Sequence, residues 1–170
     1  MIKSGDKLKD LTLLLSKDNT LLISEAIGIL RDEEPFEGAI PLLSLYYDKT
    51  EDKIVRKNIE AFMNDIKDQS VTKEIIAEIR KPYKQSTIAM LVSSCWQSGL
   101  NYSEYLKDLA EIFLSSDYIT ALECFTVIEE SVHVLTRKKR DEIISIIDDY
   151  PHSQRNEKEK LVHELVDILR

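Results

Sequence analysis

The sequence predicts an all-α protein in which about five antiparallel helix pairs stack as a solenoid. Apolar residues recur three and four positions apart, as on one face of a helix. Only four glycines and four prolines occur in 170 residues, which favours helix over turn-rich sheet. An alanine or its equivalent recurs in the second helix of the first four pairs at intervals of 30 to 33 residues, which is typical of helical repeats. These positions are Ala26, Ile59, Ala89 and Ala121.

The periodicity defines ten helical segments, or five pairs, without a linker long enough to separate two domains. We therefore expect a single repeat domain over residues 1–170. The predicted segments are 4–16, 20–31, 36–47, 52–67, 71–80, 84–98, 103–115, 118–131, 137–149 and 156–169.

Helix-terminating and helix-capping residues separate the segments. The run Asp18-Asn19-Thr20 can cap the second helix, because short polar side chains accept hydrogen bonds from the first amides of a helix. Pro35 and Pro82 flank turns, Gly99 follows a helix end, and Pro151 ends the ninth helix. The last pair lacks the alanine, as expected for a capping repeat.

The clearest pair covers residues 36–66. Its first segment includes Pro41, which should bend the helix unless the helix only begins there. Its second segment has a half-buried helical pattern. The apolar side of that segment consists of Ile54, Val55, Ile59, Phe62, Met63 and Ile66.

This pair resembles a HEAT repeat, in which the first helix carries a proline and leucines and the second opens with Val-Arg. The matching residues are Pro41, Leu42, Leu43, Leu45, Asp48, Val55, Arg56, Ile59 and Met63. The turn is longer than usual, and Ile59 replaces the customary alanine. The resemblance implies a right-handed, HEAT-like α-α superhelix. It also implies that Asp48 and Arg56 make turn and inter-repeat contacts and take no part in chemistry.

The two cysteines, Cys95 and Cys124, lie in apolar helical patterns without paired spacing, which favours a reducing compartment over a disulfide framework. Neither a signal peptide nor a membrane span is predicted. The expected location is therefore the cytoplasm.

The sequence contains no phosphate-binding glycine loop, nucleophile elbow or zinc motif. The three histidines, His133, His152 and His163, lack metal-ligand spacing. We accordingly expect no catalytic residue, no metal ligand and no cofactor, and interpret the protein as not an enzyme.

The net charge of −8 and isoelectric point near 5.0 oppose binding to nucleic acid or to an anionic membrane, since both need clustered cations. The basic run Arg137-Lys138-Lys139-Arg140 is the main exception. A solvated helix start is favoured for it, and a nucleic-acid or localisation patch and a contact for an acidic partner are the alternatives.

If the resemblance holds, the second helices line the concave recognition surface. The predicted function is then a protein-binding module or adaptor that presents a curved, acidic surface to an unidentified protein with a basic surface. Met90 and Val127 are informative as apolar residues on a polar stripe. The candidate protein-binding residues are Lys57, Glu60, Asn64, Met90, Ser94, Gln97, Glu123, Val127 and Glu130.

Two alternatives belong to other classes. HEAT-like folds also occur in DNA alkylation-repair glycosylases and in bilin lyases, so the resemblance is compatible with an enzyme. A structural repeat whose apolar end faces stack between copies is the other alternative. The sequence leaves the oligomeric state open.

Overall fold

The computed structural model describes residues 4–33 and 35–170, and all regular structure within those ranges is helical. The prediction of an all-α fold is confirmed. The described residues form ten α-helices and four short 3-10 helices, which are η1 (Gln69–Val71), η2 (Val132–Val134), η3 (His152–Gln154) and η4 (Asn156–Lys158). The helices are α1 (Ser4–Ser16), α2 (Thr20–Arg31), α3 (Ala39–Lys49), α4 (Lys53–Asp65), α5 (Thr72–Ile79), α6 (Gln85–Gln97), α7 (Leu106–Ser115), α8 (Tyr118–Ser131), α9 (Arg137–Asp149) and α10 (Glu159–Leu169).

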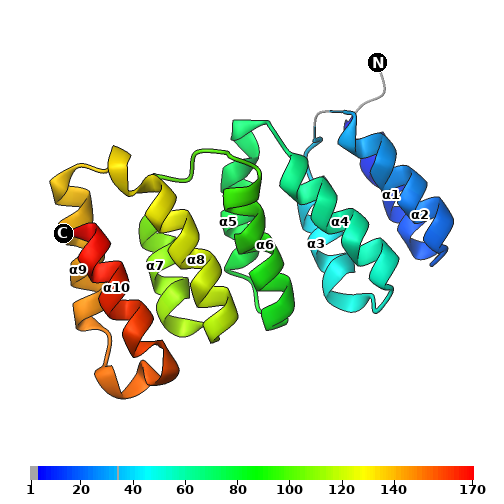
Figure 1. Cartoon of the computed structure of the whole chain (residues 1–170). Coiled ribbons are helices and arrows are strands. Elements are labelled where there is room, and N and C mark those ends of the chain that lie inside the picture. The colour runs from blue at the N-terminus through cyan, green and yellow to red at the C-terminus, as the bar shows by residue number, and fades with distance from the viewer. Residues whose placement is uncertain (1–3, 34) are drawn as a thin grey trace. The chain divides into compact units, whose positions relative to one another are not determined.

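Contacts divide the chain into two compact units, Met1–Leu100 and Asn101–Arg170. In the first unit, α1 to α6 form three antiparallel pairs, coloured blue to green in Figure 1. Helices α1, α3 and α5 pack in order in one layer, and α2, α4 and α6 pack in order in the other. In the second unit, α7 packs against α8 and α9, and α10 packs against the same two helices.

Polar side chains cap α2, as the sequence predicts, and also α4, for which no cap was predicted. The side chain of Asn19 accepts a hydrogen bond from the amide of Leu22 at the start of α2. Asp52 accepts from the amides of Ile54 and Val55 at the start of α4. These bonds satisfy amides that have no partner within the first turn of a helix.

Helix α3 begins three residues later than the periodicity predicts, at Ala39. Gly38 precedes it with a φ of +89°, a conformation that favours glycine, and a Cβ atom there would meet the side chain of Leu8 at 3.0 Å. Pro41 therefore lies in the first turn, where its missing amide removes no hydrogen bond of the helix.

Buried side chains of the second helices recur 32 residues apart in the first unit. Ile27, Ile59 and Leu91 are fully buried at equivalent positions of α2, α4 and α6. The predicted alanine markers follow a different spacing, and Ala26 and Ala89 are only half-buried. The predicted marker of α6, Ala89, lies two residues before the buried Leu91. Each residue advances a helix by about 100°, so Ala89 points away from the direction of Leu91 and of the core.

Polar side chains also join successive pairs of the first unit. Between α2 and α4, Asn58 Nδ2 donates to Ser24 Oγ at 2.7 Å, and Thr20 donates to Asp52. Between α4 and α6, Asn64 Nδ2 donates to Gln97 Oε1 at 3.0 Å. The partners are 32 to 34 residues apart, which matches the spacing of the buried positions.

Asp48 and Arg56 make structural contacts, as the resemblance implies. Asp48 Oδ1 accepts hydrogen bonds from Thr87 Oγ1 and from the amide of Lys84, both at 2.8 Å. The Arg56 guanidinium lies 4.0 Å from the centre of the Tyr47 ring and donates to the carbonyl oxygens of Tyr47 and Thr50 at 3.3 Å. Both residues therefore serve the turn and the packing of neighbouring pairs.

Candidate functional site: an apolar face beside an acidic pocket

Four large aliphatic side chains on two neighbouring second helices of the first unit are exposed to solvent. On α2, Leu21 is 67% exposed, Leu22 38% and Ile29 62%, and on α4 Ile54 is 61% exposed. We call these four residues the apolar face. Exposed large aliphatic side chains are candidates for an interaction surface, because their burial against a partner removes apolar area from water.

The register of the helices explains why Leu22 and Ile54 are both exposed. Leu22 and Ile54 are 32 residues apart, the spacing of the buried positions, so each occupies the first turn of its helix. The sequence pattern assigned Ile54 to the buried side of α4, and that assignment is wrong. Five residues separate Ile54 from Ile59, which places their side chains about 140° apart around the helix.

The polar bonds described above hold the two helices of the apolar face together. Thr20 and Ser24 of α2 bond to Asp52, which caps α4, and to Asn58 of α4, and Arg31 pairs with Asp65 at the other end. Because these contacts extend from the first to the last turn, the relative position of α2 and α4 is fixed along their length.

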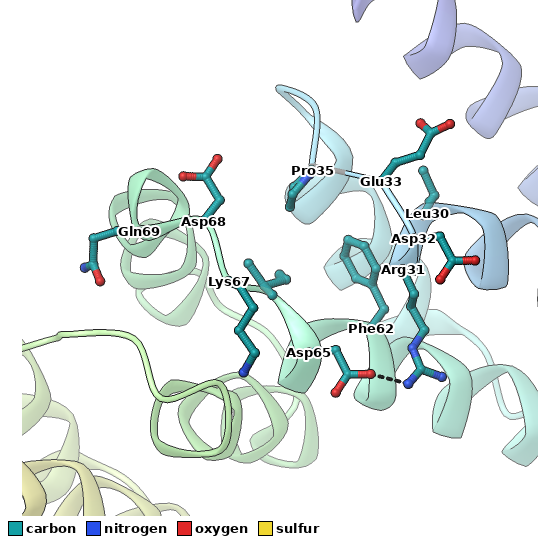
Figure 2. A pocket seen from close by; sticks show the side chains of 11 residues that line it. Leu30, Arg31, Asp32, Glu33, Pro35, Phe62, Asp65, Lys67, Asp68 and Gln69 are labelled. Carbon is teal, nitrogen blue, oxygen red and sulfur yellow. Dashed lines mark hydrogen bonds and ion pairs between the residues drawn. The ribbon is translucent and has the colours of Figure 1, made fainter.

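A pocket of about 410 Å³ lies at the carboxyl ends of α2 and α4, as Figure 2 shows. We call it the acidic pocket. Phe62, Leu30, Ile66 and Pro35 supply its apolar lining. Its polar lining consists of Arg31, Asp32, Glu33, Asp65, Lys67, Asp68 and Gln69.

Both cations of the acidic pocket are engaged. Arg31 and Asp65 point toward each other in Figure 2 and form an ion pair. Lys67 Nζ donates to the carbonyl oxygen of Ser98 at 2.6 Å. Hydrogen bonds from the amide and side chain of Ser70 lower the pKa of Asp68, so this carboxylate is ionised at neutral pH. Carboxylates outnumber cations in the pocket, and the carboxyl ends of helices add partial negative charge.

Three of the predicted binding residues on α4 lie at or near the surface. Lys57 is exposed one turn after Ile54. Glu60 is half-buried and accepts a hydrogen bond from Tyr47 Oη at 2.6 Å, so it connects α3 with α4. Asn64 is bonded to Gln97, another predicted residue, across α4 and α6.

The predicted positions on α6 and α8 are less accessible. Met90 is 8% exposed, Ser94 is fully buried and Val127 is 3% exposed, so the prediction that they lie on an open polar stripe is wrong. Ser94 occupies the position of the buried Phe62, 32 residues earlier. In α8, Glu123 is half-buried and Glu130 is exposed.

Sequence reasoning missed the apolar face and the acidic pocket. Leu21, Leu22 and Ile29 flank the buried Ile23 and Ile27 in a mostly apolar helix, and so many apolar residues hide which of them face solvent. The available signal was the spacing of Thr20, Ser24 and Arg31, polar residues that mark the side of α2 bonded to α4.

Comparison of the chain with protein-family models, with curated proteins and with solved structures gave no match. Among residues 4–33 and 35–170, no group of three or more histidine, cysteine or acidic side chains is arranged to hold a metal ion. No helix in the same ranges is long and apolar enough to cross a membrane. The fold and surface define an all-helical protein of packed antiparallel helix pairs, with an exposed aliphatic face on α2 and α4.

Proposed function

We propose that this protein is a non-enzymatic protein-binding module whose apolar face holds an amphipathic helix of a partner protein. The exposure of Leu21, Leu22, Ile29 and Ile54 on two adjacent, cross-bonded helices carries the proposal. A partner helix that lays an apolar stripe on such a surface would use the common helix-in-groove mode of recognition.

The energetics favour this face as an anchor. Complete burial of one such aliphatic side chain contributes about 1.5 to 3 kcal/mol. The bonds between α2 and α4 already fix the face, so binding costs little ordering of the module itself. A few well-buried side chains commonly supply most of the binding free energy of an interface.

The acidic pocket favours a partner with a basic side chain beside its apolar stripe. A lysine or arginine could place its aliphatic stem against Phe62 and Leu30 and its charge near Asp32 and Asp65. The net charge of −8 would raise the association rate with a basic segment. The partner we propose is therefore an amphipathic, basic helix.

We also propose that the helix pairs of the first unit form a HEAT-like, right-handed solenoid. Hydrogen bonds between residues 30 to 34 apart support a regular stack, as do the contacts of Asp48 and Arg56. In such a stack, α2, α4 and α6 line the concave side, which would place the apolar face on the surface that this architecture uses for recognition.

Selection from a displayed library of random peptides tests the proposed function, with the wild-type protein as bait. We expect selected peptides to share apolar residues three and four apart and at least one lysine or arginine. Their affinity for an Ile29→Ser/Ile54→Ser variant should fall by about tenfold or more.

Leu13→Ser is the matched control, because Leu13 is 62% exposed on α1, outside the apolar face. This variant should bind the selected peptides as the wild type does. Peptides that bind the Ile29→Ser/Ile54→Ser variant with unchanged affinity would contradict the proposed site, and acidic or unpatterned peptides would contradict the proposed partner.

A further inference from the structure

A second pocket, of about 610 Å³, lies in the second unit where α9 begins and α10 ends. We call it the arginine pocket. Three arginines and one carboxylate form its polar lining. Its lining residues are Leu135, Arg137, Arg140, Asp141, Ile144, Leu169 and Arg170.

Arg140 is held in place within this pocket. Its Nη2 atom donates to the carbonyl oxygen of Val132 at 2.8 Å, which anchors the guanidinium to the residue that follows α8. Its Nε atom is buried and has no hydrogen-bond partner. Buried donors without a partner are uncommon in folded proteins, so an acceptor that reached this group would satisfy it.

The local charge distribution opposes that of the whole chain. Arg137, Arg140 and Arg170 outweigh the single carboxylate of Asp141 in the lining, although the protein carries a net charge of −8. Of the other charged groups on the packed helices, Glu142 is paired with Lys107 of α7 at 2.5 Å. The pocket therefore has an excess of cations.

We propose that the arginine pocket binds a phosphomonoester attached to an apolar body. Guanidinium groups match the oxygens of a phosphate in geometry and charge. Because cations are in excess in the lining, a doubly charged anion gains more from it than a singly charged carboxylate does, although Asp141 also repels the dianion more strongly. The pocket is larger than one phosphate, and Leu135, Ile144 and Leu169 supply an apolar wall for the attached group.

Titration of the full chain with phenyl phosphate, followed by amide and methyl NMR shifts, tests this site. We expect saturable shifts at Arg137, Arg140 and Leu169, and binding of inorganic phosphate that is weaker by about tenfold, because it lacks the apolar body. Arg137→Gln should weaken phenyl phosphate binding by about tenfold without loss of folding, since Arg137 is exposed.

The double variant Lys138→Gln/Lys139→Gln is the matched control. Both lysines are exposed on α9 and neither lines the pocket, so their removal should leave binding nearly unchanged. An equal loss in this control and in Arg137→Gln would show a diffuse charge effect and overturn the proposal. Absence of saturable binding of phenyl phosphate at millimolar concentration would overturn it as well.

A peptide that contains phosphotyrosine distinguishes two sources of the same chemistry. Tighter binding of this peptide than of phenyl phosphate would assign the pocket to a phosphate carried by a protein. Equal binding of the two would assign it to a small organic phosphate.

Discussion

The Oδ1 atom of Asp48, near the end of α3, accepts a hydrogen bond of 2.8 Å from the Thr87 hydroxyl in α6. The same oxygen accepts the amide of Lys84, which precedes α6. One carboxylate thus joins the middle and last helix pairs of the first unit and helps to set where α6 begins.

Asp48→Ala should lower the free energy of unfolding by about 2 kcal/mol, because it removes two hydrogen bonds to an ionised acceptor. Asp48→Asn keeps one acceptor oxygen and should lose less. Urea denaturation followed by circular dichroism measures both. Asp10→Ala, at an exposed position of α1, is the control, and equal effects at Asp10 and Asp48 would contradict the assigned role.

Lys158 stabilises the second unit from within. Its Nζ atom donates to the carbonyl oxygens of Phe113, Leu114 and Ser116 at 3.0, 2.5 and 2.7 Å, at the end of α7. Burial lowers its pKa, so the hydrogen bonds must compensate for the desolvation of the ammonium group.

Lys158→Met should destabilise the protein by about 2 kcal/mol or more, since it leaves carbonyl groups of α7 without their donor. Lys160→Met is the control, because the side chain of Lys160 is 90% exposed. Denaturation of both variants, monitored by circular dichroism, tests the prediction. A Lys158→Met variant as stable as the control would show that the hydrogen bonds of Lys158 to the end of α7 contribute nothing to the free energy of unfolding.

Ionisation of Tyr47 should lower the free energy of unfolding in alkaline solution. Burial first, and then the carboxylate of Glu60, raise the pKa of Tyr47 from 10.0 to about 12. The folded state therefore keeps this proton where the unfolded state loses it. The stabilisation is complete below about pH 10 and is lost as pH rises through about 12.

Comparison of wild type with Tyr47→Phe isolates this contribution, because other tyrosines also titrate at high pH. Unfolding free energies from denaturant melts should decline more steeply above pH 10 in the wild type than in the variant. Parallel declines would contradict the raised pKa of Tyr47.

Ile54 and Ile59 should respond differently to truncation, although both belong to one aliphatic pattern. Ile59 is fully buried and Ile54 is 61% exposed. Ile59→Ala should cost about 2 to 5 kcal/mol of stability, and Ile54→Ala should cost less than about 0.5 kcal/mol. Thermal and urea melts of the two variants measure both losses. A larger loss of stability in Ile54→Ala than in Ile59→Ala would contradict the observed register of α4.

The sequence predicts helices well here because helical periodicity and capping are local properties. The predicted ranges 4–16, 20–31, 118–131 and 137–149 coincide with α1, α2, α8 and α9. Helix α3 begins later than predicted, because Gly38 adopts a positive φ against Leu8.

The alignment of one helix with the next depends on contacts between residues about 32 apart, which a local pattern does not encode. The predicted stripe therefore included the buried Met90, Ser94 and Val127. It also omitted Leu21, Leu22 and Ile29, whose exposure depends on the side of α2 that bonds to α4. The acidic pocket joins residues 30–33 and 62–69, a proximity that only the packed fold creates.

Methyl NMR of isoleucine- and leucine-labelled protein, titrated with a basic amphipathic peptide selected as above, tests whether the apolar face binds a partner helix. We expect saturable shifts at the methyl groups of Leu21, Leu22, Ile29 and Ile54, and none at the exposed Leu13 and Leu45. Shifts confined to Leu13 and Leu45, with the four residues of the apolar face unaffected, would contradict this proposal.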